Sequence, residues 1–241
     1  MPTLRGLFKR GVDLLVRPAG FELRERLVDP TAEGFPAYVV AARKRGMDVN
    51  DYEEAELKWL PPLPILQQVV FPYLHADSIV CEIGPGTGRW SRHLAARLEG
   101  GQLHLVDHSP WMVEFLSNYF AHQPNVHAHL GNGRSLPFAS DSWLDLIFAS
   151  ATFVELKLGI IYLYAREFAR VLKPGGHAIF DYIDPTTTEG WQHLVSGVLP
   201  EVYTFHAPEM INRIFCSIGF DVVERHQIRK STYIVVRKEH R

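Results

Sequence analysis

The chain has 241 residues, 46% hydrophobic and 22% charged, enough to bury the core of one domain with additions. A net charge of −2 provides no electrostatic footprint for general nucleic-acid binding. The two cysteines exclude a disulfide framework and favour a reducing, cytoplasmic compartment, and the scattered histidines predict no metal site. No apolar run reaches the ~20 residues of a membrane-spanning helix.

Residues 1–60 do not share the pattern of the rest of the chain, and we expect them to form a helical extension. Within residues 1–27, apolar side chains recur at helical spacing and basic side chains outnumber acidic ones. This pattern is typical of a helix at an anionic membrane surface, and equally of a helix that packs on its own domain. Peripheral membrane contact is therefore one of two interpretations.

A glycine turn follows the first predicted strand. Residues 78–83 are mostly apolar, as in a buried parallel strand, and Gly84, Gly86 and Gly88 come directly after them. Apolar residues at helical spacing follow over 90–98. The glycines therefore join a strand to an amphipathic helix, and they let a ligand approach the backbone without meeting a Cβ.

Local charges distinguish two kinds of ligand for this turn. A dinucleotide pyrophosphate prefers G-x-G-x-x-G with free N–H donors. Here Arg89 occupies the third glycine position, Pro85 removes a donor, and Glu82 would repel a phosphate. S-adenosylmethionine fits better, because it carries sulfonium and ammonium groups and no phosphate. An ordinary strand-to-helix turn without a ligand is the alternative.

The turn resembles the first motif of the class I S-adenosylmethionine-dependent methyltransferases, E/D-x-G-x-G-x-G, which Glu82, Gly84, Gly86 and Gly88 match. The resemblance runs from about residue 63 to the C-terminus. It implies S-adenosyl-L-methionine as the cofactor, with Pro85 also at its site. It further implies a doubly wound α/β, Rossmann-like domain over 61–241, whose seven-stranded, mostly parallel sheet has an antiparallel last strand.

A second apolar strand, 103–106, ends in Asp107, and Ser109 with Pro110 then begins a helix. Asp107 lies roughly the ~20 residues beyond a glycine turn at which a ribose-binding acid is expected. Capping of the following helix is the alternative. His108 is expected beside it in the cofactor site.

Residues 131–150 resemble the next two motifs of the family, a loop and then a fourth strand over 143–149. Asn132 stands where the family commonly has an acidic residue near the adenine amino group. A simple turn asparagine is the rival interpretation. The resemblance also places Gly133 and Ala149 in the cofactor site.

Residues 167–184 resemble a later part of the family pattern, with a helix that ends at 173–176 and a strand over 178–182. Tyr182, at the end of that strand, is expected to contact the substrate. Residues 220–228 and 232–236 are expected to close the sheet as an antiparallel pair. In related enzymes the segment before the domain often closes over the ligand, so Tyr52 and Trp59 are candidate substrate contacts, with ordinary packing as the alternative.

Three residues are candidates for a general base. Glu155 lies where many relatives have a Glu-His pair, but Leu156 replaces the histidine, so Glu155 is also a candidate substrate contact. Asp184 and His206 are candidates by inferred position, and surface or capping roles explain all three equally well.

The expected reaction is methyl transfer to a small molecule or to a glycan- or lipid-linked acceptor. Nucleic acid is disfavoured as the acceptor, because no N/D-P-P-Y/F motif follows the fourth strand. The alternatives are a non-catalytic binding or scaffold protein with the same fold, and a dinucleotide-dependent oxidoreductase. Neither the acceptor atom nor the oligomeric state follows from the sequence.

Overall fold

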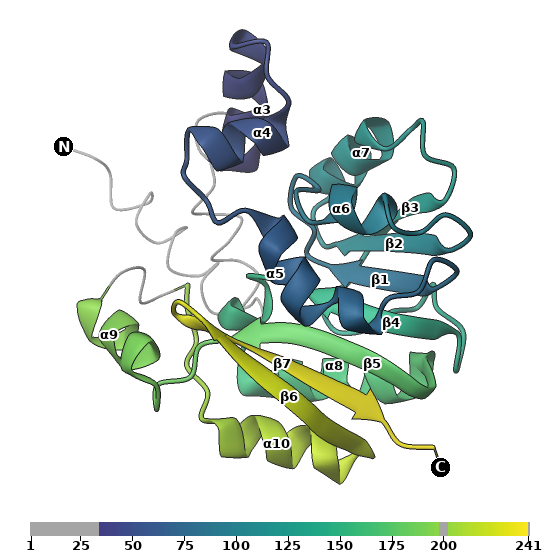
Figure 1. Cartoon of the computed structure of the whole chain (residues 1–241), viewed down its shortest axis with the longest axis vertical. Helices are drawn as coiled ribbons and strands as arrows, with labels where there is room; N and C mark the ends of the chain where they lie inside the picture. The colour runs from purple at the N-terminus through teal and green to yellow at the C-terminus, as the bar shows by residue number, and fades with distance from the viewer. Residues whose placement is uncertain (1–33, 198–201, 241) are drawn as a thin grey trace, which may run out of the picture. The chain divides into compact units, whose positions relative to one another are not determined.

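The computed structural model describes residues 34–197 and 202–240, in two compact units, Met1–Tyr52 and Glu53–Arg241 (Figure 1). The amphipathic helix that we expect within residues 1–27, whether it lies at a membrane surface or packs on the domain, is outside the described residues. In the first unit, α3 (Phe35–Lys44) has a proline in its first turn and basic residues in its last, where they complement the helix dipole. The guanidinium of Arg45 lies 5.2 Å from the centre of the Tyr52 ring.

The second unit is built on a seven-stranded sheet of order β3-β2-β1-β4-β5-β7-β6 (Figure 1). Pairing is parallel from β3 through to β5, whereas β7 runs antiparallel to both β5 and β6. The predicted mostly parallel sheet with an antiparallel last strand is confirmed. The strands are β1 (Ile79–Ile83), β2 (Gln102–Asp107), β3 (Val126–Leu130), β4 (Leu144–Ala149), β5 (Leu172–Tyr182), β6 (Phe220–Ile228) and β7 (Ser231–Lys238).

Helix α4 (Val49–Ala55) spans the boundary between the two units. The described helices of the second unit that follow it are α5 (Pro62–Val69), α6 (Ser91–Ala95), α7 (Pro110–Tyr119), α8 (Leu158–Val171), α9 (Thr188–Ser196) and α10 (Pro208–Ser217), with short 3₁₀ turns η1 (Phe71–Tyr73) and η2 (Phe153–Glu155). Helices α6 and α7 pack against β2, while α8 and α10 contact each other and pack against β5 and β6 respectively. In Figure 1, α5 crosses in front of the sheet and α8 lies behind it.

The hydrophobic core follows from the strand sequences. In β4 every residue except Asp145 is buried, as expected for a central strand covered on both faces. In β6 the exposure alternates along the strand, because it is the edge strand and one face meets solvent. Aromatic rings fill the space between β5 and α10: the Phe180 ring centre lies 5.1 Å from that of Phe215 and 4.6 Å from that of Phe153.

Two predicted boundaries need correction. Strand β5 begins at Leu172 rather than near 178, because Leu172 already pairs with Leu144 of β4. The register then shifts, and Gly175 with φ 81° allows this irregularity within the strand. The helix after the glycine turn is shorter than the apolar spacing predicts, since α6 covers only Ser91–Ala95.

The strand directions bring several chain segments to one edge of the sheet. Strands β1, β2, β4 and β5 run parallel, so the segments that follow them leave from the same edge. Strand β6 runs in the same direction as β5, because β7 is antiparallel to both. The hairpin at residues 229–230 therefore lies at this edge too. Among the described residues, no helix is both long enough and apolar enough to cross a membrane.

Candidate functional site

The glycine turn after β1 is constrained by conformation and by packing. Gly84, Gly86 and Gly88 have φ values of 68°, 57° and 88°, in the left-handed region that glycine tolerates best. A Cβ on Gly84 would lie 2.2 Å from Oγ1 of Thr152, and one on Gly88 would lie 2.9 Å from the ring of Phe120. The turn is thus packed against the loop after β4 and the end of α7.

Glu82 precedes this turn on β1, and its side chain is almost completely buried. The hydroxyl of Ser91 donates a 2.6 Å hydrogen bond to Oε2 of Glu82. Burial raises the pKa of Glu82 to about 7, although the Ser91 bond and the charge of Arg89 act in the opposite direction. A carboxylate in this setting favours a cationic ligand and opposes a phosphate. Pro85, in the turn itself, is buried and has no N–H to offer an anion.

Asp107 ends β2 beside the turn, since the N–H of Gly84 donates to the carbonyl oxygen of Val106 at 2.8 Å. Its Oδ1 accepts a 2.9 Å bond from the N–H of Ser109 and lies 3.5 Å from Nδ1 of His108. Ser109 is the residue that caps α7. No described residue donates a hydrogen bond to Oδ2 of Asp107. A carboxylate oxygen with remaining acceptor capacity fits a ribose diol.

Asn132 lies in the loop after β3, which is linked to the previous strand by a 2.7 Å bond from the N–H of Gly131 to the carbonyl oxygen of Asp107. The Asn132 side chain closes a local turn: Oδ1 accepts the N–H groups of residues 134 and 135, and Nδ2 donates to Oγ of Ser135. Gly133 is buried, with φ 71°. The geometry matches the turn interpretation of Asn132, and its contact with adenine stays a prediction.

The loop after β4 contains site residues that the sequence did not single out. Ala149, which it did, is the buried last residue of β4. Next, Oγ of Ser150 lies 2.7 Å from the hydroxyl of Tyr233, and the N–H of Ala151 donates to Oδ1 of Asp181 at 2.7 Å. Thr152 donates to the carbonyl oxygen of Ile83 at 3.2 Å. An acidic residue within the apolar run of β5 was the available signal for Asp181.

The candidate base His206 forms hydrogen bonds with residues that adjoin the other two candidates in the chain. His206 donates through Nε2 to the carbonyl oxygen of Leu156 at 2.9 Å, next to half-buried Glu155 in η2. The backbone N–H of His206 donates to the carbonyl oxygen of Ile183 at 3.0 Å, and Ile183 directly precedes Asp184. Burial lowers the pKa of His206, so its ring is neutral near pH 7. His206 is thus hydrogen-bonded to the chain neighbours of Glu155 and Asp184.

Asp184 is already engaged locally. Its Oδ1 accepts bonds from the N–H and the hydroxyl of Thr186 at 2.8 and 2.6 Å. This arrangement leaves Oδ2 as the oxygen that could accept a substrate proton.

The predicted substrate contacts lie in different settings. Tyr182 is fully buried within the hydrophobic core, among the aromatic and aliphatic side chains of β5, α8 and α10. Trp59 is half-buried, with the Arg89 guanidinium 5.3 Å from its ring centre. Tyr52 belongs to the first unit. Their roles in substrate binding stay predictions. Among the described residues, no group of histidine, cysteine or acidic side chains could hold a metal ion.

Comparison with known proteins supports one family. Residues 80–176 match a family described as a methyltransferase domain. These residues contain the glycine turn, Asp107 and the loops after β3 and β4.

The proteins similar to the chain include two curated relatives and, among the solved structures, a methyltransferase. A malonyl-[acyl-carrier protein] O-methyltransferase of Marinomonas sp. is 29% identical over 51% of this chain and 45% of its own length. The biotin biosynthesis bifunctional protein BioHC of Cellvibrio japonicus is 32% identical over 47% of this chain and 22% of its own length. The chain thus spans less than half the length of either relative. A SAM-dependent methyltransferase from Aquifex aeolicus has the same fold, with a TM-score of 0.60 and 20% identity over 82% of this chain and 96% of its own.

Proposed function

We propose, on the premise that this chain belongs to the class I S-adenosylmethionine-dependent methyltransferases, that it transfers a methyl group to a small organic acceptor. The cofactor is S-adenosyl-L-methionine, which supplies an activated methyl group on its sulfonium. The observation that carries the proposal is the convergence of the glycine turn, Glu82 and Asp107 at one edge of the sheet, within the segment that matches the methyltransferase domain.

The residues at this edge fit the cofactor. The available oxygen of Asp107 accepts a hydrogen bond from a ribose hydroxyl, and the partly exposed backbone of the glycine turn leaves room for the ligand. The carboxylate of Glu82 favours the cationic part of the ligand. The loop at residues 131–133 lies next to Asp107, where it would border the adenine.

The same residues argue against a dinucleotide. A buried carboxylate next to the turn repels a pyrophosphate, and Pro85 removes one of the N–H donors on which a pyrophosphate depends. The oxidoreductase alternative is therefore the weaker one. A scaffold protein without turnover would bind the cofactor equally well, and product formation separates it from an enzyme.

The acceptor enters at the same edge, near η2 and residues 183–197 and 202–206. Glu155, Asp184 and His206 are the candidates to take a proton from a hydroxyl acceptor, and a carboxylate acceptor would need no base. One relative is described as a malonyl-[acyl-carrier protein] O-methyltransferase, which makes a carboxylate oxygen the first acceptor to test. A glycan- or lipid-linked acceptor is the second.

Two measurements test the proposal in sequence. Calorimetric titration with S-adenosylmethionine, S-adenosylhomocysteine and NAD should show binding of the first two and none of the third. Release of S-adenosylhomocysteine is then followed with malonyl-acyl carrier protein, free dicarboxylic acids and hydroxylated lipids as acceptors. Binding of NAD alone would contradict the proposal, and cofactor binding without turnover on any acceptor would favour a scaffold.

A further inference from the structure

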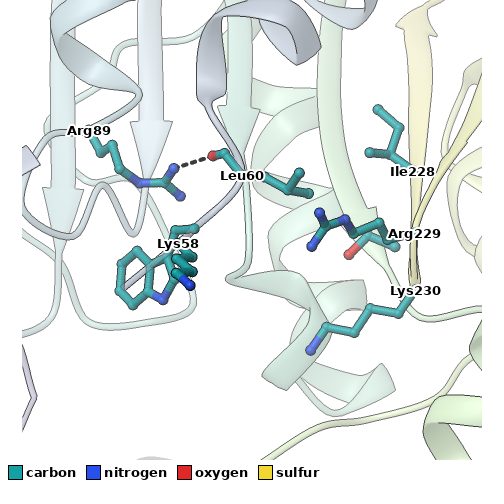
Figure 2. A pocket seen from close by; sticks show the side chains of 8 residues that line it. Lys58, Leu60, Arg89, Ile228, Arg229 and Lys230 are labelled. Carbon is teal, nitrogen blue, oxygen red and sulfur yellow. Dashed lines mark hydrogen bonds between the residues drawn. The ribbon is translucent and has the colours of Figure 1, made fainter. Parts of the chain in front are cut away.

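A pocket of about 460 Å³ lies at the ligand-binding edge of the sheet, between the segment before α5 and the β6–β7 hairpin. In Figure 2, Lys58 and Arg89 approach it from one wall, while Arg229 and Lys230 extend from the other. The remaining lining residues are Trp59, Leu60, Ile228 and Ser231. None of the described residues that line this pocket is acidic.

The four cations differ in whether a carboxylate already neutralises them. Arg89 is largely buried, and its Nε lies 3.8 Å from Oε2 of Glu53, so protein groups hold it in place. Lys58, Arg229 and Lys230 form no ion pair within 4 Å with any residue that the structure describes. Lys58 and Arg229 therefore have no carboxylate of a described residue within ion-pair distance, and Lys230 interacts only at longer range with the buried carboxylate of Asp181.

Lys230 is held by neutral groups. Its ammonium lies 3.7 Å from the centre of the Tyr203 ring and 3.4 Å from Nε2 of His193. Burial and the charge of Lys230 lower the pKa of His193, so that ring is uncharged near pH 7. Among the described residues, the Lys230 ammonium thus has these direct contacts with neutral groups and no ion pair with a carboxylate, and it keeps donors for an anion.

The backbone places two of these cations at a conformational cost. Arg229 is the first residue of the two-residue turn between Ile228 and Ser231, and its φ is 53°. Asparagine or glycine occupies such a position more easily. Lys58, on the opposite wall, also has φ 53°. Both walls therefore carry a cation where the backbone would favour a smaller residue, as occurs at binding sites.

We propose that this pocket binds the anionic group, a carboxylate or a phosphate ester, of a small organic ligand. Lys58, Arg229 and Lys230 would supply the charge-assisted hydrogen bonds, and Trp59 and Ile228 the apolar contact. That this ligand is the methyl acceptor rests on the proposed function, because Arg89 directly follows the glycine turn at which the cofactor is expected.

The test removes the positive charges of Arg229 and Lys230, and it compares the effect on anion binding with the effect of removing two positive charges outside the pocket. Malonate and inorganic pyrophosphate are titrated calorimetrically into the wild-type chain, an R229Q/K230Q variant, and an R213Q/R237Q control whose exposed side chains lie outside the pocket. At least one anion should bind the wild type and weaken with added salt. We expect a loss of at least about tenfold in R229Q/K230Q and less than about twofold in the control.

Several outcomes would contradict the proposal that this pocket binds an anion. Equal losses in both double variants would indicate a general effect of net charge. Unchanged anion affinity in R229Q/K230Q would show that the pocket is not the site. Binding of phosphatidylglycerol vesicles with no response to either anion would assign the cations to a lipid surface.

Two further measurements keep the proposals separate. The single variant K230Q keeps Arg229, the residue with positive φ in the turn. It therefore replaces R229Q/K230Q if thermal melting shows that the double variant does not fold. S-adenosylhomocysteine is titrated into every variant: normal binding with lost anion affinity supports both proposals. If the wild type binds the anion but not S-adenosylhomocysteine, the anion pocket stands and the proposed function fails.

Discussion

Ser231 donates a hydrogen bond of 2.9 Å to Oδ2 of Asp181, while Oδ1 of the same carboxylate accepts the N–H of Ala151 at 2.7 Å. Asp181 thereby connects the β6–β7 hairpin, which lines the cationic pocket, to the loop after β4. That loop contacts the glycine turn through Thr152. A single buried carboxylate thus holds together the two sides of the candidate site.

Replacing Asp181 should destabilise this connection. Asp181→Ala leaves the N–H of Ala151 and the hydroxyl of Ser231 without their acceptor, and because both donors can reach solvent, each lost hydrogen bond costs about 0.5–1.5 kcal/mol. We expect the free energy of unfolding in urea to fall by about 1–3 kcal/mol. Asp181→Asn should lose less, because its amide oxygen still accepts one bond. Equal stability of Asp181→Ala and the parent would show that the connection is not needed.

Asp107→Ala should weaken cofactor binding without unfolding the domain. Hydrogen bonds from ribose hydroxyls to a carboxylate contribute about 1.5–3 kcal/mol, which corresponds to a ten- to hundredfold loss of affinity. Asp107→Asn should lose less. The measurement is calorimetric titration with S-adenosylhomocysteine, with circular dichroism as the check on folding. Unchanged affinity in both folded variants would show that Asp107 does not bind the cofactor and that its hydrogen bond with the N–H of Ser109 is structural.

Cofactor affinity should depend on pH through Glu82. Burial raises its pKa to about 7 in the free protein, so the carboxyl group is largely protonated below that pH. A cation that pairs with the ionised form must displace this proton, so affinity should fall by up to about tenfold per pH unit below pH 7. Glu82→Gln should bind more weakly at pH 8 and show a flat profile between pH 6 and 8. If cofactor affinity in Glu82→Gln still depends on pH between 6 and 8, a titratable group other than Glu82 causes the dependence.

The stability of the β2–β3 pair should fall in acid because of His104. Its Nδ1 lies 2.9 Å from Nε2 of His129, and burial followed by the charges of His129 and His127 lowers the pKa of His104 to about 4. The unfolded chain takes up this proton near pH 6.5, so the stabilisation is present above that pH and is lost as the pH falls toward 4.

The expected loss from this histidine between pH 7 and pH 4.5 is about 2 kcal/mol in the free energy of unfolding. His104→Gln should reduce the acid sensitivity, whereas the same change at exposed His122 should leave it unaltered. Urea denaturation at both pH values measures the difference. If His104→Gln and the parent lose equal stability in acid, another group controls the transition.

Local sequence was sufficient for the sheet and for the residues at the ends of its strands. The mostly apolar runs 78–83, 103–106 and 143–149 predicted β1, β2 and β4, and they placed Glu82 and Asp107 at or next to the strand ends. Parallel strands leave from one edge of a sheet, so their order along the chain was enough to group these side chains. The β6–β7 pair was expected from the resemblance to the family, which adds a closing antiparallel pair.

The tertiary structure determines which long-range hydrogen-bond and charge partners the polar side chains have. Asp181 joins two loops, and the cations of the hairpin face Lys58 across a pocket. Neither relationship has a local signal, because each joins residues that are far apart in the chain. The turn at Asn132, by contrast, did have a local signal, because its side-chain oxygen accepts the N–H groups of residues 134 and 135. The start of β5 at Leu172, like the partners of Asp181, depends on the tertiary structure: pairing with Leu144 extends the strand through Gly175 and Gly176, which by local preference end the helix.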